Sequence, residues 1–238
     1  MTFIFPRAHL SGLTISMAGS SPSFSVSAGQ AADSSNSAIV NLPAALSKTA
    51  AIWAAGSGGG LDTGTIAVNT WYHAFLIASA DGSLADIVVS TSLTSPVLPV
   101  GYALFRRIGA MRTDGSGNWI KFQQLGDEFI WDAGVLDFNS SGVASRALYA
   151  LTVPPGVRVS SQVVIFVNGA SPGSATSVAC PDIVGPGGSQ VIQNSSSQGL
   201  AALTVRTNTS QQIAITQGAA GPLSIWTLGW TDRRGKDD

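Results

Sequence analysis

The sequence predicts an all-β protein made of two antiparallel β-sandwich domains, of the jelly-roll or immunoglobulin-like type, with very little helix. Two observations predict this class. Apolar residues alternate with polar ones over short runs, which is the period of a half-buried strand and not of a helix. Gly, Pro, Asn, Asp and Ser separate these runs at the spacing of turns.

Four short runs show the alternation most clearly, and each can place every second side chain in a core. They are Leu13–Met17, Phe24–Ser27, Leu203–Arg206 and Ile213–Thr216. A fifth run, Val163–Val167, is apolar at every position. Such a strand is expected to be covered on both faces or to lie at the centre of a sandwich, so we expect it to anchor the core of the second domain.

The segments between these strands carry turn signals. Asp81-Gly82 and Asp114–Asn118 supply residues that tolerate positive φ, so both are predicted to be hairpin turns. Gly56–Gly60, which has one serine among its glycines, is predicted to be a loop without regular structure. Only Leu42–Ala55 could be partly helical, because a proline suited to a first helical turn precedes two alanines and a leucine. A short helix and an extended segment stay open there.

Turn formers without a sustained pattern run from Gly134 to Ser145. We therefore expect two domains, residues 1–135 and 136–238, each long enough for a core of its own. The chain closes with a cluster of charged residues, 232–238, after an apolar strand. These last residues are expected to form a solvated tail.

Charge is scarce in this chain. Charged residues make up 11% of it and the formal net charge is -1, whereas roughly 25% of an average soluble domain is charged. Such a neutral surface repels other copies weakly, so we expect much of it to be buried in an assembly. The chain has no basic field for a phosphate backbone, and nucleic acid is not an expected partner.

The remaining composition excludes some classes of protein. The single cysteine, Cys180, cannot form an internal disulfide and is expected to be a buried thiol. Neither a signal peptide nor a transmembrane helix is expected, because no apolar stretch has the required length and flanks.

Few residues offer catalytic chemistry. His73 lies in a strand-like run and is expected to be a structural histidine. Gly169–Gly173 matches the nucleophile motif Gly-x-Ser-x-Gly, but Pro172 has no N–H for an oxyanion hole, so a turn is expected there. Asp127 and Glu128 could form a carboxylate pair for sugar hydrolysis, yet neighbouring strand residues point to opposite faces. We predict that the protein is not an enzyme, with no catalytic residues, no metal site and no cofactor.

The six tryptophans of this neutral chain include candidate sugar-binding platforms, in which an exposed ring stacks on a pyranose. Trp119 is the best candidate because it follows a turn. Trp71 and Trp226 lie in apolar strands and are expected to be core residues. The other three stay open: Trp53, Trp131 and Trp230.

The start of the chain is apolar as well. Phe3 and Phe5 are candidates for a docking segment, since termini are loose unless they are tied down; an ordinary first strand in the core is the alternative. Unpaired strand edges in a chain with few charges also predict a closed homo-oligomer, which covers such edges without open-ended growth.

Five motifs follow one another in the first half of the chain: Gly59–Gly64, Asn69–His73, Pro96–Tyr102, Arg106–Gly109 and Thr113–Asn118. As a set they resemble a recurrent segment of tailed-phage and prophage virion proteins, of the tail fibre or distal-tail, baseplate-associated kind. The resemblance is strong from Leu10 to Trp131 and looser in the second half.

This resemblance implies a structural virion protein, a tail fibre or baseplate component located in the phage tail and assembled in the host bacterial cytoplasm. The implied partners are other tail and baseplate proteins and a host surface glycan or outer-membrane protein. A homotrimer is expected, because fibres and tail tips of resembling proteins are commonly threefold. No catalytic residues carry over. Two alternatives stay open: a host-polysaccharide-binding or depolymerising tail enzyme, and a decoration protein of the capsid surface or head fibre.

Overall fold

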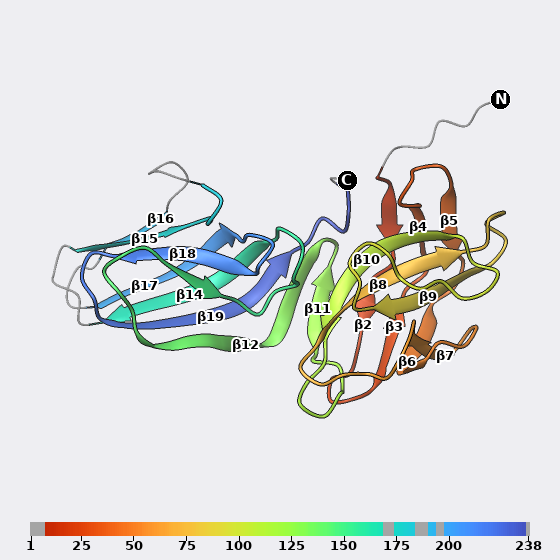
Figure 1. Cartoon of the computed structure of the whole chain (residues 1–238), viewed down its shortest axis with the longest axis horizontal. Helices are drawn as coiled ribbons and strands as arrows, with labels where there is room; N and C mark the ends of the chain where they lie inside the picture. The colour runs from red at the N-terminus through yellow and green to blue at the C-terminus, as the bar shows by residue number, and fades with distance from the viewer. Residues whose placement is uncertain (1–7, 169–173, 184–189, 194–197, 237–238) are drawn as a thin grey trace. The chain divides into compact units, whose positions relative to one another are not determined.

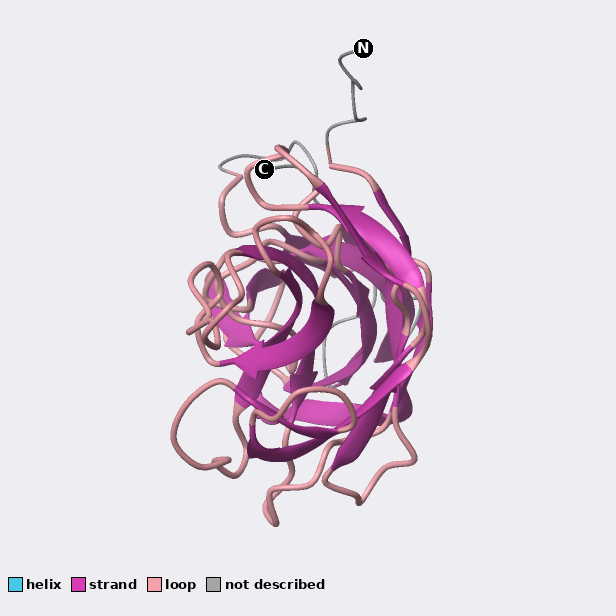
Figure 2. Cartoon of the chain, turned by 90° about the vertical axis from the view of Figure 1, so that its right-hand side faces the viewer, coloured by secondary structure: helices cyan, strands magenta, loops and turns pink. Residues whose placement is uncertain are grey.

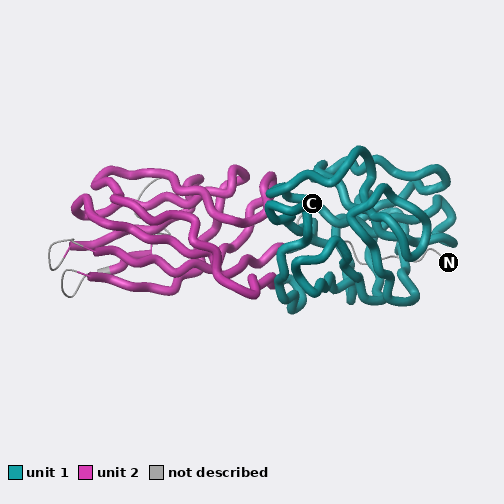
Figure 3. Tube along the Cα trace, turned by 90° about the horizontal axis from the view of Figure 1, so that it is seen from below, with its two compact units in different colours: residues 1–127, 233–238 teal, residues 128–232 magenta. Residues whose placement is uncertain are grey.

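The computed structural model describes residues 8–168, 174–183, 190–193 and 198–236. These residues form strands, turns and loops but no helix, so the prediction of an all-β chain is confirmed (Figure 2). No helix in the described part is long and apolar enough to cross a membrane. The chain divides into two compact units, residues 1–127 with 233–238 (unit 1) and residues 128–232 (unit 2) (Figure 3).

Unit 1 contains a three-stranded sheet of order β1-β4-β5 and a seven-stranded sheet of order β10-β8-β9-β7-β6-β3-β2 (Figure 1). The larger sheet is mixed and not purely antiparallel as expected, because β7 runs parallel to both β6 and β9. The strands of unit 1 are β1 (Leu10–Gly12), β2 (Ile15–Ser16), β3 (Ser23–Val26), β4 (Gly29–Ala32), β5 (Ile39–Leu42), β6 (Leu46–Ile52), β7 (Gly58–Leu61), β8 (Trp71–Ala78), β9 (Ala85–Ser90), β10 (Leu104–Arg112) and β11 (Phe122–Leu125).

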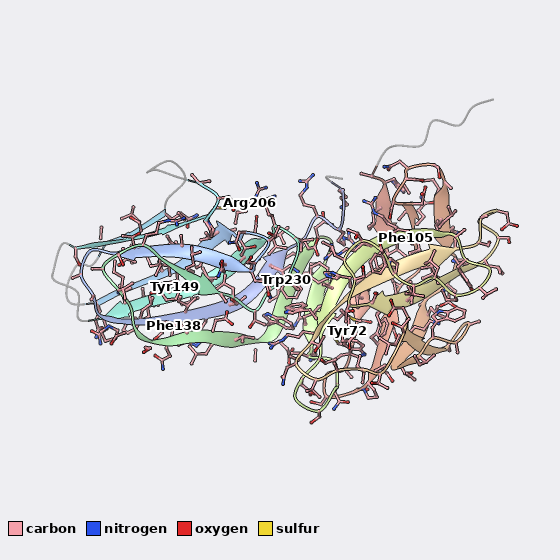
Figure 4. The ribbon with its side chains drawn as sticks, viewed as in Figure 1. Tyr72, Phe105, Phe138, Tyr149, Arg206 and Trp230 are labelled. Carbon is pink, nitrogen blue, oxygen red and sulfur yellow. The ribbon has the colours of Figure 1, made fainter. Side chains whose placement is uncertain are left out.

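Aromatic rings fill part of the core of unit 1. Trp119 is 0% exposed, and its ring meets those of Phe24 and Tyr72 edge to face, at centroid separations of 5.7 and 5.6 Å. The indole Nε1 of Trp119 donates a 2.8 Å hydrogen bond to the carbonyl oxygen of Pro22, so its polar atom is satisfied away from water. Tyr72, labelled in Figure 4, belongs to β8, whose positions from Tyr72 to Ala78 are all buried.

Two segments of unit 1 differ from the expectations. Leu42–Ala55, where a short helix was open, contains strand β6. The glycine run was predicted to be a loop, and this is wrong in part because Gly58–Leu61 forms strand β7. Glycine is required by the close approach of β6, since a Cβ atom on Gly59 would lie 1.7 Å from the carbonyl oxygen of Ile52. Alternation cannot reveal such a strand, because glycine has no side chain to alternate.

Both predicted hairpin turns are confirmed. Asp81-Gly82 lies between the antiparallel strands β8 and β9, with Gly82 at a φ of 72°. Asp114–Asn118 joins Thr113 to Trp119, which pair as an antiparallel bridge. The Asp114 carboxylate accepts hydrogen bonds from two N–H groups within this turn. The second turn therefore returns the chain so that Trp119 enters the core.

Unit 2 holds two further groups of strands, one of order β12-β19-β14-β17 and one of order β13-β18-β15-β16 (Figure 1). The pairs described within unit 2 are antiparallel. Its strands are β12 (Glu128–Ser141), β13 (Ala147–Ala150), β14 (Ser160–Asn168), β15 (Ala175–Ala179), β16 (Gln190–Gln193), β17 (Gln198–Arg206), β18 (Gln212–Gln217) and β19 (Pro222–Thr231).

Strand β14 lies between β19 and β17, and its burial alternates. Val163, Ile165 and Val167 are buried, while the residues between them are only half-buried. This apolar run therefore contributes to the core as expected, but with one face only. Phe138 of β12 and Tyr149 of β13, which belong to different sheets, meet edge to face at 4.8 Å between ring centroids (Figure 4).

The units divide at a different place from the predicted domains. Unit 2 begins at Glu128, where β12 starts, and a boundary between residues 135 and 136 would cut through this strand. The chain returns to unit 1 at Arg233, so unit 2 is an insertion into unit 1. Gly134 and several of the turn formers that follow it lie within the long strand β12.

The contact at Gly59 yields a test of the fold. Gly59→Ala is expected to lower the free energy of unfolding by at least about 2 kcal/mol, because the new methyl group forces β6 and β7 apart. Gly115→Ala is the control, since a Cβ atom there meets nothing within 4 Å, and it should change stability by less than about 0.5 kcal/mol. Urea unfolding of both variants measures the difference; equal stabilities would contradict the parallel pairing of β6 and β7.

Candidate functional site

The tryptophans lie in places other than those expected. Trp119 was the predicted sugar platform, and this prediction is wrong because its ring is fully buried between Phe24 and Tyr72. Trp71 and Trp226, expected in the core, are half-buried. Trp131 and Trp230 are buried, and Trp53 is half-buried. The docking candidates Phe3 and Phe5 lie outside the described residues.

The residues considered for nucleophilic chemistry have structural surroundings where they are described. His73 is 2% exposed, and its Nδ1 accepts a 3.0 Å hydrogen bond from Nε of Arg107. This contact agrees with the structural role that the sequence predicts. Cys180 is buried, as expected. The Gly169–Gly173 motif lies outside the described residues.

Asp127 is held by two cations near the end of the chain. Its Oδ1 lies 2.8 Å from the guanidinium of Arg234, and its Oδ2 lies 2.7 Å from Nζ of Lys236. Burial raises the pKa of the Asp127 carboxyl, but the hydrogen bonds and charges of Lys236 and Arg234 outweigh burial and hold that pKa below its usual value. Asp127 is thus an ionised structural carboxylate. Its neighbour Glu128, the other residue of the candidate carboxylate pair, accepts a hydrogen bond from Gln162.

The same contacts correct the prediction of a solvated tail for part of residues 232–236, while residues 237 and 238 lie outside the described residues. Arg234 is 4% exposed, and the carbonyl oxygen of Gly235 accepts a 2.6 Å hydrogen bond from the buried Arg106. Asp232 is 3% exposed. Charged residues at a chain end usually remain in water. The partners of Arg234 and Gly235 come from more than 100 positions earlier in the chain, and a local sequence pattern cannot identify them.

A second ion pair, which the sequence analysis missed, is buried in unit 1. Nζ of Lys48 lies 2.6 Å from Asp86, and the two side chains are 0% and 2% exposed. Lys48 also donates to the carbonyl oxygen of Ala54, and Asp86 accepts from the N–H of Gly56. Burial lowers the pKa of Lys48, and Asp86 opposes this only in part. The pair fixes the segment between β6 and β7 and is closed to substrates.

An apolar row crosses the outer face of one sheet of unit 2. Val164 points away from the core, because both of its neighbours along β14 are buried. Residues directly opposite each other in antiparallel strands share a face of the sheet. Val164 lies opposite Trp226 of β19 and Ala202 of β17, and Trp226 lies opposite Leu136 of β12. The row therefore spans four strands.

A shorter row lies beside it, because Phe166 of β14 is opposite Leu200 of β17 on the same face. Both rows together are termed the apolar band, which consists of Leu136, Val164, Phe166, Leu200, Ala202 and Trp226. Leu200 is 68% and Leu136 48% exposed. Val164, Phe166 and Trp226 are half-buried. Leu136 on β12 and Leu200 on β17 are thus more exposed than the band residues of β14 and β19 between them.

Uncharged polar residues flank the apolar band along the strands. Gln162 lies opposite Thr204 on one side, and Asn168 lies opposite Gln198 on the other. Arg206 follows at the end of β17. Unit 2 carries eight charged residues in all: Glu128, Asp132, Asp137, Arg146, Arg158, Asp182, Arg206 and Asp232. The outer face of the sheet is therefore apolar at its centre and polar but uncharged immediately around it, and two charged residues, Glu128 and Arg206, lie at one end of the face in the row of Ser160.

The sequence contained one signal for the apolar band. Val163–Val167 is apolar at every position, which predicted a strand covered on both faces or lying at the centre of a sandwich. In unit 2 only one face of this strand enters the core, so the same run marks an apolar outer face. The residues opposite Val164 could not be identified from the sequence, because a local pattern does not determine the pairing register between strands that are distant in the chain.

Within the described residues, no group of three or more His, Cys, Asp and Glu side chains is placed to hold a metal ion. Comparison of the chain with family models, curated proteins and solved structures gives no match.

The position of Trp119 predicts how its removal acts. Trp119→Ala is expected to cost about 3–5 kcal/mol of stability, because it leaves a large cavity in a packed core. Trp226→Ala should cost less, since that ring is half-buried. Thermal unfolding measures both. A Trp119→Ala protein that keeps the native melting temperature and loses binding to a glycan would restore the sugar-platform hypothesis.

The ion pairs of Asp127 predict a pH-dependent loss of stability. Asp127→Asn should cost about 1–3 kcal/mol at pH 7, because two cations lose their acceptor. The folded-state pKa of Asp127 is depressed, so its contribution is present above the unfolded pKa of about 3.9 and is lost as pH falls through the folded pKa. The difference between wild type and Asp127→Asn should therefore shrink below about pH 4.

The control for this variant is Asp182→Asn. Asp182 pairs with Arg158 at 2.7 Å, but their side chains are 40% and 56% exposed, so water and salt screen this pair and its removal should cost clearly less than the removal of Asp127. Denaturant unfolding between pH 3 and pH 8 measures both variants. Equal losses at pH 7 would contradict the structural importance assigned to Asp127.

Proposed function

We propose that this chain is a non-enzymatic structural protein of a tailed bacteriophage particle, a tail fibre or baseplate component that resides in the tail and assembles in the host bacterial cytoplasm. The observation that carries the proposal is the apolar band. A broad sheet face that is apolar at its centre and uncharged immediately around that centre suits contact with another protein more than chemistry on a substrate.

The candidate catalytic residues support the same role. Asp127 is engaged by Arg234 and Lys236, and His73 by Arg107. A carboxylate whose pKa is lowered by two cations is a poor general acid at neutral pH, because the acid must hold its proton there. The proposed role also requires no cofactor.

The resemblance to tail fibre and baseplate-associated proteins is the reason why we propose a phage tail as the location of the chain. All five motifs belong to unit 1, where Gly59–Gly64 includes most of β7, Asn69–His73 leads into β8 and Arg106–Gly109 lies in β10. The motif residues form strands and turns of a single unit, as expected if this chain and the resembling proteins have the same scaffold. The motifs therefore support a common architecture and add no reaction.

The proposed partners are other tail and baseplate proteins, further copies of the chain, and a host surface glycan or outer-membrane protein. Three copies is the number that the resemblance implies. In finer detail, we propose that unit 2 is a β-sandwich of the jelly-roll or immunoglobulin-like type, whose two sheets enclose a core that includes Phe138 and Tyr149. This arrangement would leave the apolar band on the outside of one sheet.

Polysaccharide binding is the second candidate. Trp226 is half-buried on an apolar sheet face, and the face of an indole ring can stack on a sugar. A depolymerising enzyme would need two suitably placed carboxyl groups in addition.

The test uses purified phage particles and the recombinant chain. Mass spectrometry should find the chain in the particles, and antibody labelling should place it on the tail. Labelling of the head would favour a capsid decoration protein, and absence from particles would overturn the proposal. Incubation of the recombinant chain with host capsule or lipopolysaccharide should release no reducing ends; release that Asp127→Asn abolishes would favour the enzyme.

A further inference from the structure

We infer that the apolar band of unit 2 is the surface through which one copy of this chain binds a second copy. The inference deepens the proposed assembly role and rests on it, because it requires copies of the chain to be neighbours, but it expects a twofold contact in place of the three copies that the resemblance implies. It is carried by the size of the sheet face, by the lack of charge within the apolar band and by the order of large and small residues across the sheet.

The face is large enough for a specific contact. Four strands about 4.8 Å apart and nine residues long at about 3.3 Å per residue give a face of about 550 Å². Two such faces together bury about 1,100 Å², which just exceeds the roughly 1,000 Å² that a specific interface needs. A pairing of this size is expected to be reversible in dilute solution and to be reinforced where the copies are held together in a particle.

The composition of the face favours an identical partner. Interfaces place apolar and aromatic residues at the centre and polar residues at the rim, as the apolar band and its flanking glutamines, threonine and asparagine do. A charged partner would find no opposite charge on the band itself. Two copies of the band can approach without repulsion, and Trp226 would lie near the centre, where the strongest contacts of an interface are usually found.

The order of residues across the sheet makes the band complementary to itself. A twofold axis that runs parallel to the strands, midway between two facing sheets, places β12 of one copy over β17 of the second and β19 over β14. Leu136 then faces Ala202 of the second copy, and Trp226 faces Val164. In the shorter row, Phe166 faces Ser224. Leu136, Trp226 and Phe166 are thus set against smaller side chains, while Leu200 faces the polar Asn139 of the second copy.

The experiment measures self-association of the full chain by light scattering over a range of concentrations. Leu136→Lys and Leu200→Lys place a charge in the band at residues exposed enough to tolerate it. Leu148→Lys is the matched control, because Leu148 is 46% exposed, close to the 48% of Leu136, but belongs to β13 of the other sheet. Circular dichroism and thermal unfolding of each variant confirm that it is folded.

The wild-type chain and Leu148→Lys should reach a mass of two chains, about 49 kDa from the 24.3 kDa of one. Leu136→Lys and Leu200→Lys should weaken the association at least about tenfold, because a buried lysine finds no partner charge. Three chains of 24.3 kDa have a mass near 73 kDa. If the wild type and both band variants have this mass, the inference is overturned and the proposed trimer remains. A wild type that stays monomeric, or that uses the band to bind host polysaccharide, would also overturn it.

Discussion

The scarcity of charge is the constraint on which the rest of the structure depends. The chain has 12 Lys and Arg and 13 Asp and Glu among 238 residues, and several of these are inside it. Lys48 pairs with Asp86, and Arg234 with Asp127, with side chains that are mostly or fully buried. A buried charge is tolerated only with its partner in place. The consequence is a surface with little charge left to keep copies apart, which agrees with the proposed role in an assembly.

The apolar band lies on unit 2, which is inserted into unit 1. The chain leaves unit 1 after Asp127 and returns at Arg233, and the contact between Asp127 and Arg234 holds the two connections together. Unit 2 is therefore tied to unit 1 at both of its ends. Unit 1 contains the motifs that resemble tail proteins and the buried ion pairs, while unit 2 carries the apolar band. The division separates the unit that carries these motifs from the surface proposed to bind a second copy.

The sequence predicted what local patterns encode, namely the all-β class, the two hairpin turns and the apolar strand of the second core. It failed where burial depends on distant residues. Trp119 follows a turn, which indicates exposure, yet its Nε1 is bonded to Pro22, 97 positions earlier. Gly58–Leu61 has no side-chain pattern, so the parallel pairing with β6 was invisible. The apolar band was hidden for a similar reason: a continuously apolar strand looks the same whether its second face is covered or bare.

The central claim is that the apolar band joins two copies of the chain, and a cysteine cross-link tests it most directly. Val164→Cys places a thiol near the proposed twofold axis, and the native Cys180 is 4% exposed and should react little. A short bismaleimide added to the Val164→Cys protein should join two chains, whereas Leu148→Cys, on the other sheet, should give little product. Equal cross-linking of the two variants, or none at Val164→Cys at concentrations where the chain associates, would contradict the account.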